Sequence, residues 1–168
     1  MSTNITIQEM TADDWTAVAQ IYADGIATGE ATFETDVPTW EAWDSSHLPN
    51  GRFVAQSEGG EIVGWAALSP VSSRCVYAGV AEVSVYVAPT VWGQGVGKRL
   101  LQALVDSSEA AGIWMLQASI FPENEASVKL HEKCGFRIVG RREKLGQQYD
   151  RWRDVLFMER RSQKVGLA

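Results

Sequence analysis

The chain has 168 residues and is 45% apolar, which suits one domain over residues 1–168 with a core at about 5–160. A net charge of −6 argues against nucleic acid or an anionic membrane as the main partner. No apolar run reaches the length of a membrane span, and residues 1–7 lack the basic and apolar regions of a signal peptide, so we expect a cytoplasmic protein.

Strands and helices alternate along the first half of the chain without linkers or repeats. Apolar periodicity and capping residues indicate where each element begins. Gly59 and Gly60 mark a hairpin turn between two strands. The expected elements are a strand at 5–9, a helix that begins near Thr11 and continues through Ile26, a short helix from Pro38 with Trp40 and Trp43, and strands at 52–57 and 61–68.

The second half continues the same alternation. The expected elements are a strand at 80–87, a helix ending at Gly112, a strand at 114–120, a helix at 124–134, and strands at 136–142 and 152–159. Hairpins and crossover helices occur together, so the sequence predicts an α/β (α+β) fold with a mixed central β-sheet. Residues 162–168 are expected to form a frayed tail.

A glycine-rich turn joins the strand at 80–87 to the helix after it. Gly93, Gly95 and Gly97 lie at the start of that helix, which has an apolar stripe made of Val96, Leu100, Leu101, Leu104 and Val105. Such a turn leaves backbone N–H groups unpaired at the positive end of a helix, which favours a pyrophosphate. Glu82 lies on the preceding strand, and an acid beside a phosphate-bearing cofactor indicates a group-transfer enzyme.

Two common phosphate-binding motifs do not fit this turn. A P-loop needs Ser or Thr after Gly-Lys and a glycine five residues earlier, but here Arg99 follows Lys98 and Trp92 takes the earlier position. A dinucleotide motif that starts at Gly93 needs a third glycine where Lys98 stands. ATP, GTP and NAD are therefore disfavoured as ligands.

The segment from Trp92 to Gly97 instead resembles the acyl-CoA cradle of the GCN5-related N-acetyltransferases (GNAT), whose pattern is Gln/Arg-x-x-Gly-x-Gly/Ala. Both glycines match, and Trp92 replaces Arg or Gln, which leaves the backbone cradle intact. Residues 124–136 resemble a later block of the same family, Asn-x-x-Ser followed by Leu-Tyr/His-x-x-x-Gly-Phe, in which Asn124 is a helix N-cap and Gly135 ends the helix.

Three further segments resemble the phosphinothricin and methionine sulfone/sulfoximine acetyltransferases of that superfamily: residues 31–34, Arg74 with Tyr77, and Arg151-Trp-x-Asp154. The likeness spans about residues 5–160. It implies the GNAT fold, with about four helices and a splayed pair of strands at 80–87 and 114–120. It also implies acetyl-CoA as cosubstrate, a small-molecule amine as acceptor, and a homodimer.

The resemblance implies that two backbone segments and one helix start hold acetyl-CoA. The residues expected to contact it are Val85, Tyr86, Val87, Gly93, Gln94, Gly95, Val96, Gly97, Lys98, Asn124 and Ser127. Asn124 has a simpler alternative role as a plain helix cap, and both roles are compatible.

Glu82 is expected to be the general base. A free glutamate titrates near pH ~4.3, and burial raises that value. The alternative is a strand glutamate that faces solvent or an ion pair. His131 stands where many relatives have Tyr, and it is expected to protonate the leaving thiolate, with simple packing as the alternative. Cys75 and Cys134 form no spacing pattern and are expected to be reduced thiols, and no cluster has metal-ligand spacing, so no metal is expected.

The acceptor is expected to contact Phe33, Arg74, Tyr77 and Tyr149. A guanidinium such as that of Arg74 can hold a carboxylate bidentately, the alternative being a surface arginine without a partner. Gln148 and Asp150 replace a lysine and a glycine of the relatives. An added acid near the acceptor disfavours a doubly anionic substrate such as phosphinothricin.

The leading interpretation is an N-acetyltransferase that acts on a small, amino-acid-like amine. Transfer to a protein N-terminus or lysine would need an open groove, whereas residues 32–34 and Arg74 favour a closed pocket. A catalytically silent acetyl-CoA-binding module is disfavoured by Glu82. The apolar, Trp-containing C-terminal region favours a homodimer.

Overall fold

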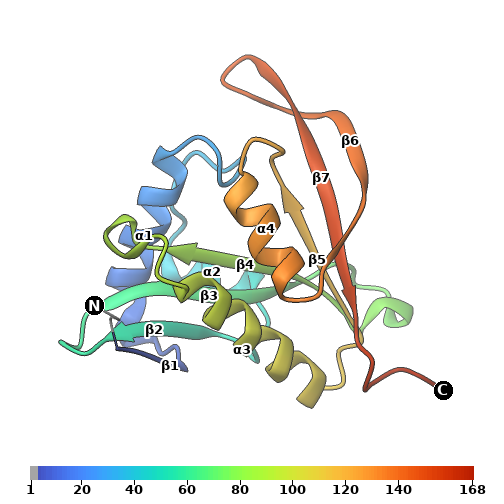
Figure 1. Ribbon diagram of the computed structural model, residues 1–168, viewed down its shortest axis with the longest axis horizontal. Coiled ribbons are helices and arrows are strands. Elements are labelled where there is room, and N and C mark those ends of the chain that lie inside the picture. The colour runs from blue at the N-terminus through green and yellow to red at the C-terminus, as the bar shows by residue number, and fades with distance from the viewer. Residues whose placement is uncertain (1–3) are drawn as a thin grey trace.

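The computed structural model describes residues 4–168, so the sequence features of Met1 to Thr3 lie outside it (Figure 1). Its centre is a seven-stranded sheet in the order β1-β2-β3-β4-β5-β7-β6. The strands are β1 Ile5–Glu9, β2 Phe53–Ser57, β3 Ile62–Pro70, β4 Val80–Val87, β5 Met115–Ile120, β6 Arg137–Gln148 and β7 Arg151–Arg161. Only β4 and β5 pair in parallel among the described strands.

Four α-helices cover the sheet within residues 4–168: α1 Trp15–Ala27, α2 Trp40–Ser46, α3 Val96–Ala110 and α4 Glu125–Lys133. Short 3-10 turns, η1 Ala12–Asp14, η2 Cys75–Tyr77 and η3 Pro89–Val91, precede α1, β4 and α3. The predicted α/β class, mixed sheet and four helices are confirmed. The expected cap at Thr11 is present, because its N–H donates to the Asp14 carboxylate at 2.8 Å. Thr39 caps α2 as well, since its Oγ1 accepts the Ala42 N–H at 3.2 Å.

Each face of the sheet has its own apolar core. Strand β3 alternates between them, with Ala66 and Leu68 in one core and Trp65 and Ala67 in the other. The first core holds the predicted α3 stripe, all of it buried, and Figure 1 shows α3 and α4 in front of the sheet. The second core packs α1 and α2 on the opposite face through residues that include Val18, Ile21 and Trp43.

Strands β4 and β5 pair only at their beginnings. Residues 80–82 of β4 pair with residues 115–117 of β5, and Glu82 opposite Gln117 is the last pair. Beyond that point β4 continues along β3 to Val87, while β5 continues along β7 to Ile120. The two strands therefore diverge, which confirms the predicted splay.

The C-terminal strands are longer than expected and form one hairpin. Strand β6 continues to Gln148 and β7 begins at Arg151, so only Tyr149 and Asp150 make the turn. Both have positive φ, 48° and 62°, as a tight hairpin turn requires. The sequence prediction ended β6 too early because neither turn residue is glycine or asparagine.

The segment expected to fray begins with well-defined contacts. The Ser162 N–H donates to the Trp114 carbonyl at 2.8 Å, and Ser162 Oγ donates to the buried Glu109 at 3.0 Å. Lys164 and Arg160 pair with the same carboxylate. Burial alone would raise the pKa of Glu109, but these donors outweigh it and hold the pKa below its usual value. Within residues 4–168, no helix is both long and apolar enough to span a bilayer.

Gly79 sets the start of the β4–β5 pair. Its carbonyl accepts from the N–H groups of Trp114 and Met115 at 2.9 and 3.0 Å, and a Cβ on Gly79 would lie 2.1 Å from the Trp114 ring. We expect Gly79→Ala to lower the free energy of unfolding by about 1–3 kcal/mol, measured from denaturant midpoints. Gly140→Ala on β6 is the control, since nothing lies within 4 Å of its Cβ position. Equal effects of the two changes would contradict this account.

Candidate active site

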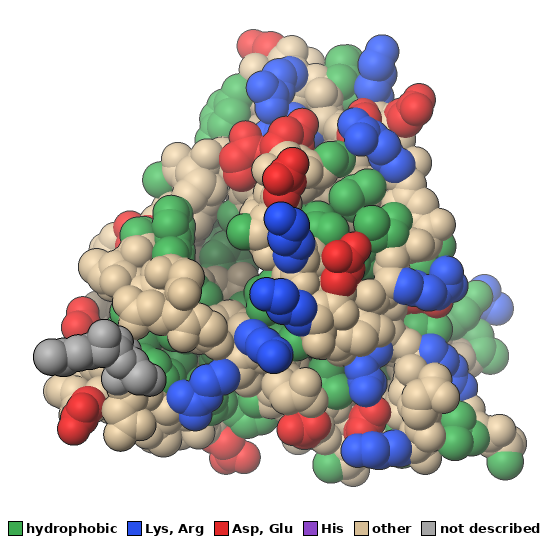
Figure 2. Space-filling model, in the orientation of Figure 1, with side chains coloured by type: hydrophobic (Ala, Val, Ile, Leu, Met, Phe, Trp, Pro, Cys, Tyr) green, Lys and Arg blue, Asp and Glu red, His purple; other side chains and the backbone are tan. Residues whose placement is uncertain are grey.

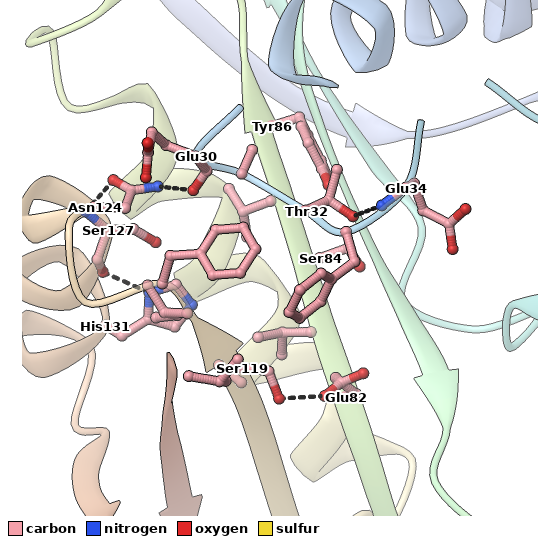
Figure 3. Close-up of a pocket in the computed structure, with 18 residues that line it drawn as sticks. Glu30, Thr32, Glu34, Glu82, Ser84, Tyr86, Ser119, Asn124, Ser127 and His131 are labelled. Carbon is pink, nitrogen blue, oxygen red and sulfur yellow. Dashed lines mark hydrogen bonds between the residues drawn. The ribbon is translucent and has the colours of Figure 1, made fainter. Parts of the chain in front are cut away.

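A cavity of about 330 Å³ opens where β4 and β5 diverge (Figure 3). Four segments enclose it: the loop after α1 at 30–34, β4 at 82–86, the end of β5 with Phe121 at 118–121, and α4 with its N-cap. The remaining lining residue is Val155 on β7. The structure thus brings together segments more than 100 residues apart in sequence.

Backbone groups of β4 face this cavity. The Ala88 N–H donates to the Val63 carbonyl at 2.8 Å, which directs that residue's backbone toward β3. Since successive strand residues point their backbone groups to opposite sides, Val85 directs its own toward the gap. Val87 faces the same side, but its carbonyl accepts from Trp92 Nε1 at 2.8 Å. Tyr86 instead pairs with β3 and lines the cavity, and its ring packs in a cluster with those of Trp65 and Tyr22, which also contact each other. Burial raises the pKa of Tyr86, so its hydroxyl stays protonated at neutral pH.

The glycine-rich turn has the conformation that its sequence indicates. Gly93 and Gly95 have positive φ, 78° and 80°, and Gly95 is the N-cap of α3. Nothing lies within 4 Å of a Cβ placed on either residue, so the turn faces open space. The Arg99 N–H makes an intrahelical bond to the Gly95 carbonyl, and the N–H groups in the turn before it point out of the helix end.

Gly97 has a different role from the other two glycines. A Cβ on Gly97 would lie 3.1 Å from Leu130 of α4 and 3.5 Å from Val87 of β4. This glycine therefore allows α3 to approach α4 closely. The sequence analysis had grouped it with Gly93 and Gly95 as part of the phosphate-binding turn.

Basic side chains gather near the turn although the chain is acidic overall. Figure 2 shows a row of Lys and Arg over the region of α4 and the start of α3. The basic residues of these segments are Lys98, Arg99, Lys129 and Lys133. The helix end and this row make the surface beside the cavity locally attractive to a polyanion.

Glu82 is half-buried and faces the cavity at the point where the strands separate. The Ser119 hydroxyl donates to its Oε1 at 3.2 Å, and the Gln117 amide lies 3.5 Å from the same oxygen (Figure 3). Both neighbours are neutral, so neither compensates the negative charge of the carboxylate. Sequence reasoning missed Ser119, whose role follows only from the pairing of β5 beside β4.

His131 is buried, and its Nδ1 lies 2.7 Å from the Ser127 carbonyl. A carbonyl can only accept, so Nδ1 carries the hydrogen and Nε2 of the neutral ring is an acceptor. Burial lowers the pKa of His131, which favours that neutral form. The geometry therefore favours His131 as a proton acceptor, whereas the sequence interpretation made it the donor to the thiolate.

Asn124 caps α4 as expected, because its Oδ1 accepts the Ser127 N–H at 3.2 Å. Its amide nitrogen also donates to the Glu30 carbonyl at 3.3 Å. That nitrogen has a second hydrogen, which allows a further bond to a ligand. One side chain thus joins the helix start to the loop after α1.

Of the four residues expected to hold the acceptor, only Phe33 lines the cavity. Arg74 and Tyr77 lie on or beside the exposed η2, with the guanidinium 5.6 Å from the Tyr77 ring centre. Tyr149 is 71% exposed at the tip of the β6–β7 hairpin. Over residues 4–168, no three His, Cys, Asp or Glu side chains are grouped so that they could hold a metal ion.

Comparison with known proteins agrees with this geometry. Residues 9–136 match the model of the Acetyltransferase (GNAT) family. The chain is 32% identical over 158 residues to the L-methionine sulfoximine/L-methionine sulfone acetyltransferase of Pseudomonas aeruginosa, which covers 91% of this chain and 92% of that protein. It is 34% identical over 155 residues to the phosphinothricin N-acetyltransferase of Streptomyces coelicolor, with 88% and 91% covered.

A solved structure shows the same architecture. The GNAT superfamily phosphinothricin acetyltransferase from Sinorhizobium meliloti, in complex with acetyl-CoA, superposes with a TM-score of 0.89 at 30% identity, covering 100% of this chain and 92% of that one. The family match, the splayed strands and the glycine turn together show that this chain belongs to the GNAT family of acetyltransferases.

Proposed function

We propose that the protein transfers an acetyl group from acetyl-CoA to the primary amine of a small, amino-acid-like acceptor. The observation that carries the proposal is the single cavity in which the free edge of β4 and Glu82 meet, beside the glycine turn of α3. Similarity to methionine sulfoximine/sulfone and phosphinothricin acetyltransferases supports the acceptor class. Residues 30–34 close one side of the cavity, which favours a small acceptor over a peptide.

The residues at the site fit acetyl-CoA, which when bound supplies the acetyl group as a thioester. The outward N–H groups at the start of α3 and the row of basic side chains suit the pyrophosphate. Backbone groups of Val85 and the Asn124 amide suit the amides of the pantetheine arm. Open space around Gly93 and Gly95 leaves room for the phosphates.

Two groups at the site can accept the proton that the acceptor ammonium must lose. Glu82 is our proposed general base, acting directly or through water, and Ser119 orients its carboxylate. The Nε2 of His131 is a second acceptor on the same cavity. A neutral Ser119 beside Glu82 leaves the carboxylate charge uncompensated, which favours binding of the cationic amine before the proton moves.

We also propose that the protein is a cytoplasmic homodimer. The β6–β7 hairpin exposes large apolar side chains, which are Ile138, Val139, Leu145, Tyr149 and Trp152. A second copy covering this hairpin would bury them around a two-fold axis. The predicted contacts of Arg74, Tyr77 and Tyr149 with the acceptor then depend on that assembly. Both cysteines are free thiols in the structure, which is compatible with a reducing compartment.

We expect Gly95→Asp to weaken CoA binding by at least ~10-fold, because it adds a negative charge at the helix start. Isothermal calorimetry measures the affinity. Gly112→Asp is the matched control, since Gly112 also has a positive φ and open space around it but lies at the other end of α3. Unchanged CoA affinity in a folded Gly95→Asp protein would remove the phosphate site from the proposal.

Glu82→Gln retains the shape of the side chain and removes its proton acceptor. We expect kcat to fall by about 10²- to 10⁴-fold while the KM for acetyl-CoA changes little. Thiol release against a panel of amino acids and their sulfone, sulfoximine and phosphinate analogues measures both constants. Glu61→Gln, in the β2–β3 turn, is the control. A loss below roughly threefold with chemistry rate-limiting would make Glu82 structural.

Trp152→Asp places a charge on the exposed hairpin, next to its turn. We expect it to convert a dimer into a monomer, as measured by sedimentation velocity at micromolar concentration. Val76→Asp is the control, because Val76 is also exposed but lies on η2. A wild-type protein that sediments only as a monomer would refute the dimer and leave the acetyltransferase assignment intact.

A further inference from the structure

The loop after α1 forms one complete side of the cavity. Residues 30–34 all line it, and none of them belongs to a helix or strand. We call these five residues the acceptor wall. An irregular segment lacks a ladder of regular backbone hydrogen bonds, so its position depends on bonds from other elements.

Two side chains from the C-terminal hairpin supply such bonds. Arg153 donates from Nη1 to the Gly29 carbonyl at 2.9 Å and from Nη2 to the Glu30 carboxylate at 2.7 Å. The Gln148 amide donates to the Thr32 carbonyl at 2.8 Å, and its Oε1 accepts from Arg153 Nη1 at 2.7 Å. The bonds to the loop after α1 join positions that are 116 to 124 residues apart.

The same guanidinium also contacts a second segment of the cavity, at the end of β5. It lies 3.8 Å from the ring centre of Phe121, and its Nη2 lies 3.3 Å from the Glu123 carboxylate. Phe121 lines the cavity and meets Phe33 of the acceptor wall edge to face at 4.8 Å. Arg153 therefore fixes two cavity segments relative to each other, although it is not one of the residues that line the cavity.

Burial makes this arrangement specific. Arg153 is 4% exposed and Gln148 is 6% exposed. A buried guanidinium is costly unless its partners are in place, so displacing the acceptor wall would leave a buried charge without its hydrogen bonds. Such a cluster favours one position of the wall.

We propose that Arg153 and Gln148 are positioning residues that set the acceptor wall and thereby determine which amines fit beside Glu82. The inference rests on the proposed function for its choice of substrate. The wall crosses β4 near Ser84 and Tyr86, while the glycine turn that suits the phosphates lies beyond the end of that strand (Figure 3). The effect therefore falls more on the acceptor than on acetyl-CoA, whose proposed partner Asn124 bonds the wall at the Glu30 carbonyl.

Arg153→Lys tests the proposal. Lysine keeps the charge but lacks the planar fork that bonds Gly29, Glu30 and Gln148 together. We expect the KM for the acceptor to rise at least ~10-fold while the KM for acetyl-CoA changes less than ~2-fold. The ranking of acceptors in the thiol-release panel should shift toward bulkier amines, and amide hydrogen exchange at residues 29–34 should accelerate.

Arg52→Lys is the matched control. Arg52 also bonds backbone carbonyls, of Leu48 and His47, and pairs with Asp44, but it joins α2 to β2 away from the cavity. A purely structural role predicts that both variants lower Tm and that neither changes acceptor KM or exchange at 29–34. Gln148→Ala should reproduce part of the Arg153→Lys effect, and the double variant should be less than additive because the two side chains act together.

Acceptor KM and wall exchange that match the wild type in a folded Arg153→Lys protein would overturn the proposal. If Arg153→Lys does not fold, the same two readouts on Gln148→Ala decide it. A wild-type protein that acetylates no amine in the panel would refute the proposed function. Hydrogen exchange needs no substrate, so it tests the positioning role separately. Unchanged exchange at residues 29–34 in Arg153→Lys would overturn that role, and faster exchange would support it.

Discussion

The divergence of β4 and β5 after Glu82 is the constraint on which the rest of the site depends. Strand backbones need hydrogen-bond partners, and β4 loses its neighbour on one side for the length of Val83 to Val87. The gap leaves polar backbone groups facing a cavity in the centre of the sheet, where neighbouring strands are normally joined by continuous hydrogen bonds. The other parts of the site lie around this gap, with the glycine turn at one end and Glu82 at the other.

Each end of the gap is suited to a different charge. The start of α3 combines outward N–H groups with a row of basic side chains, although the whole chain carries −6. Glu82 at the other end has a hydroxyl and an amide as neighbours. The two ends of the gap therefore favour groups of opposite charge, a polyanion at the start of α3 and a cation beside Glu82.

Hydrogen bonds between distant parts of the chain hold the one side of the cavity that the sheet does not form. The acceptor wall has no regular structure, and the β6–β7 hairpin holds it from the far end of the chain. The side chain of Gln148, which the resemblance marked as a departure from the family pattern, bonds Thr32 and Arg153 directly. From the sequence, Gln148 was grouped with changes near the acceptor. In the structure its side chain instead supports the acceptor wall from behind.

The sequence by itself determined the elements and the turn chemistry, because these depend on neighbours within one or two turns. The periodicity from Val96 to Val105, the caps at Thr11 and Asn124, and the glycines with positive φ all lie where the sequence predicts them. Resemblance to known blocks added the splay and the choice of acyl-CoA as the ligand of the glycine turn.

Only the tertiary structure decided which of these residues meet. It showed Gly97 as a packing residue, and it left Arg74 and Tyr149 outside the cavity of a single chain. It also revealed Ser119 beside Glu82 and the bonds from Arg153 to the loop after α1. Those relations depend on strand register and on contacts across more than 30 residues, which no local pattern in the chain encodes.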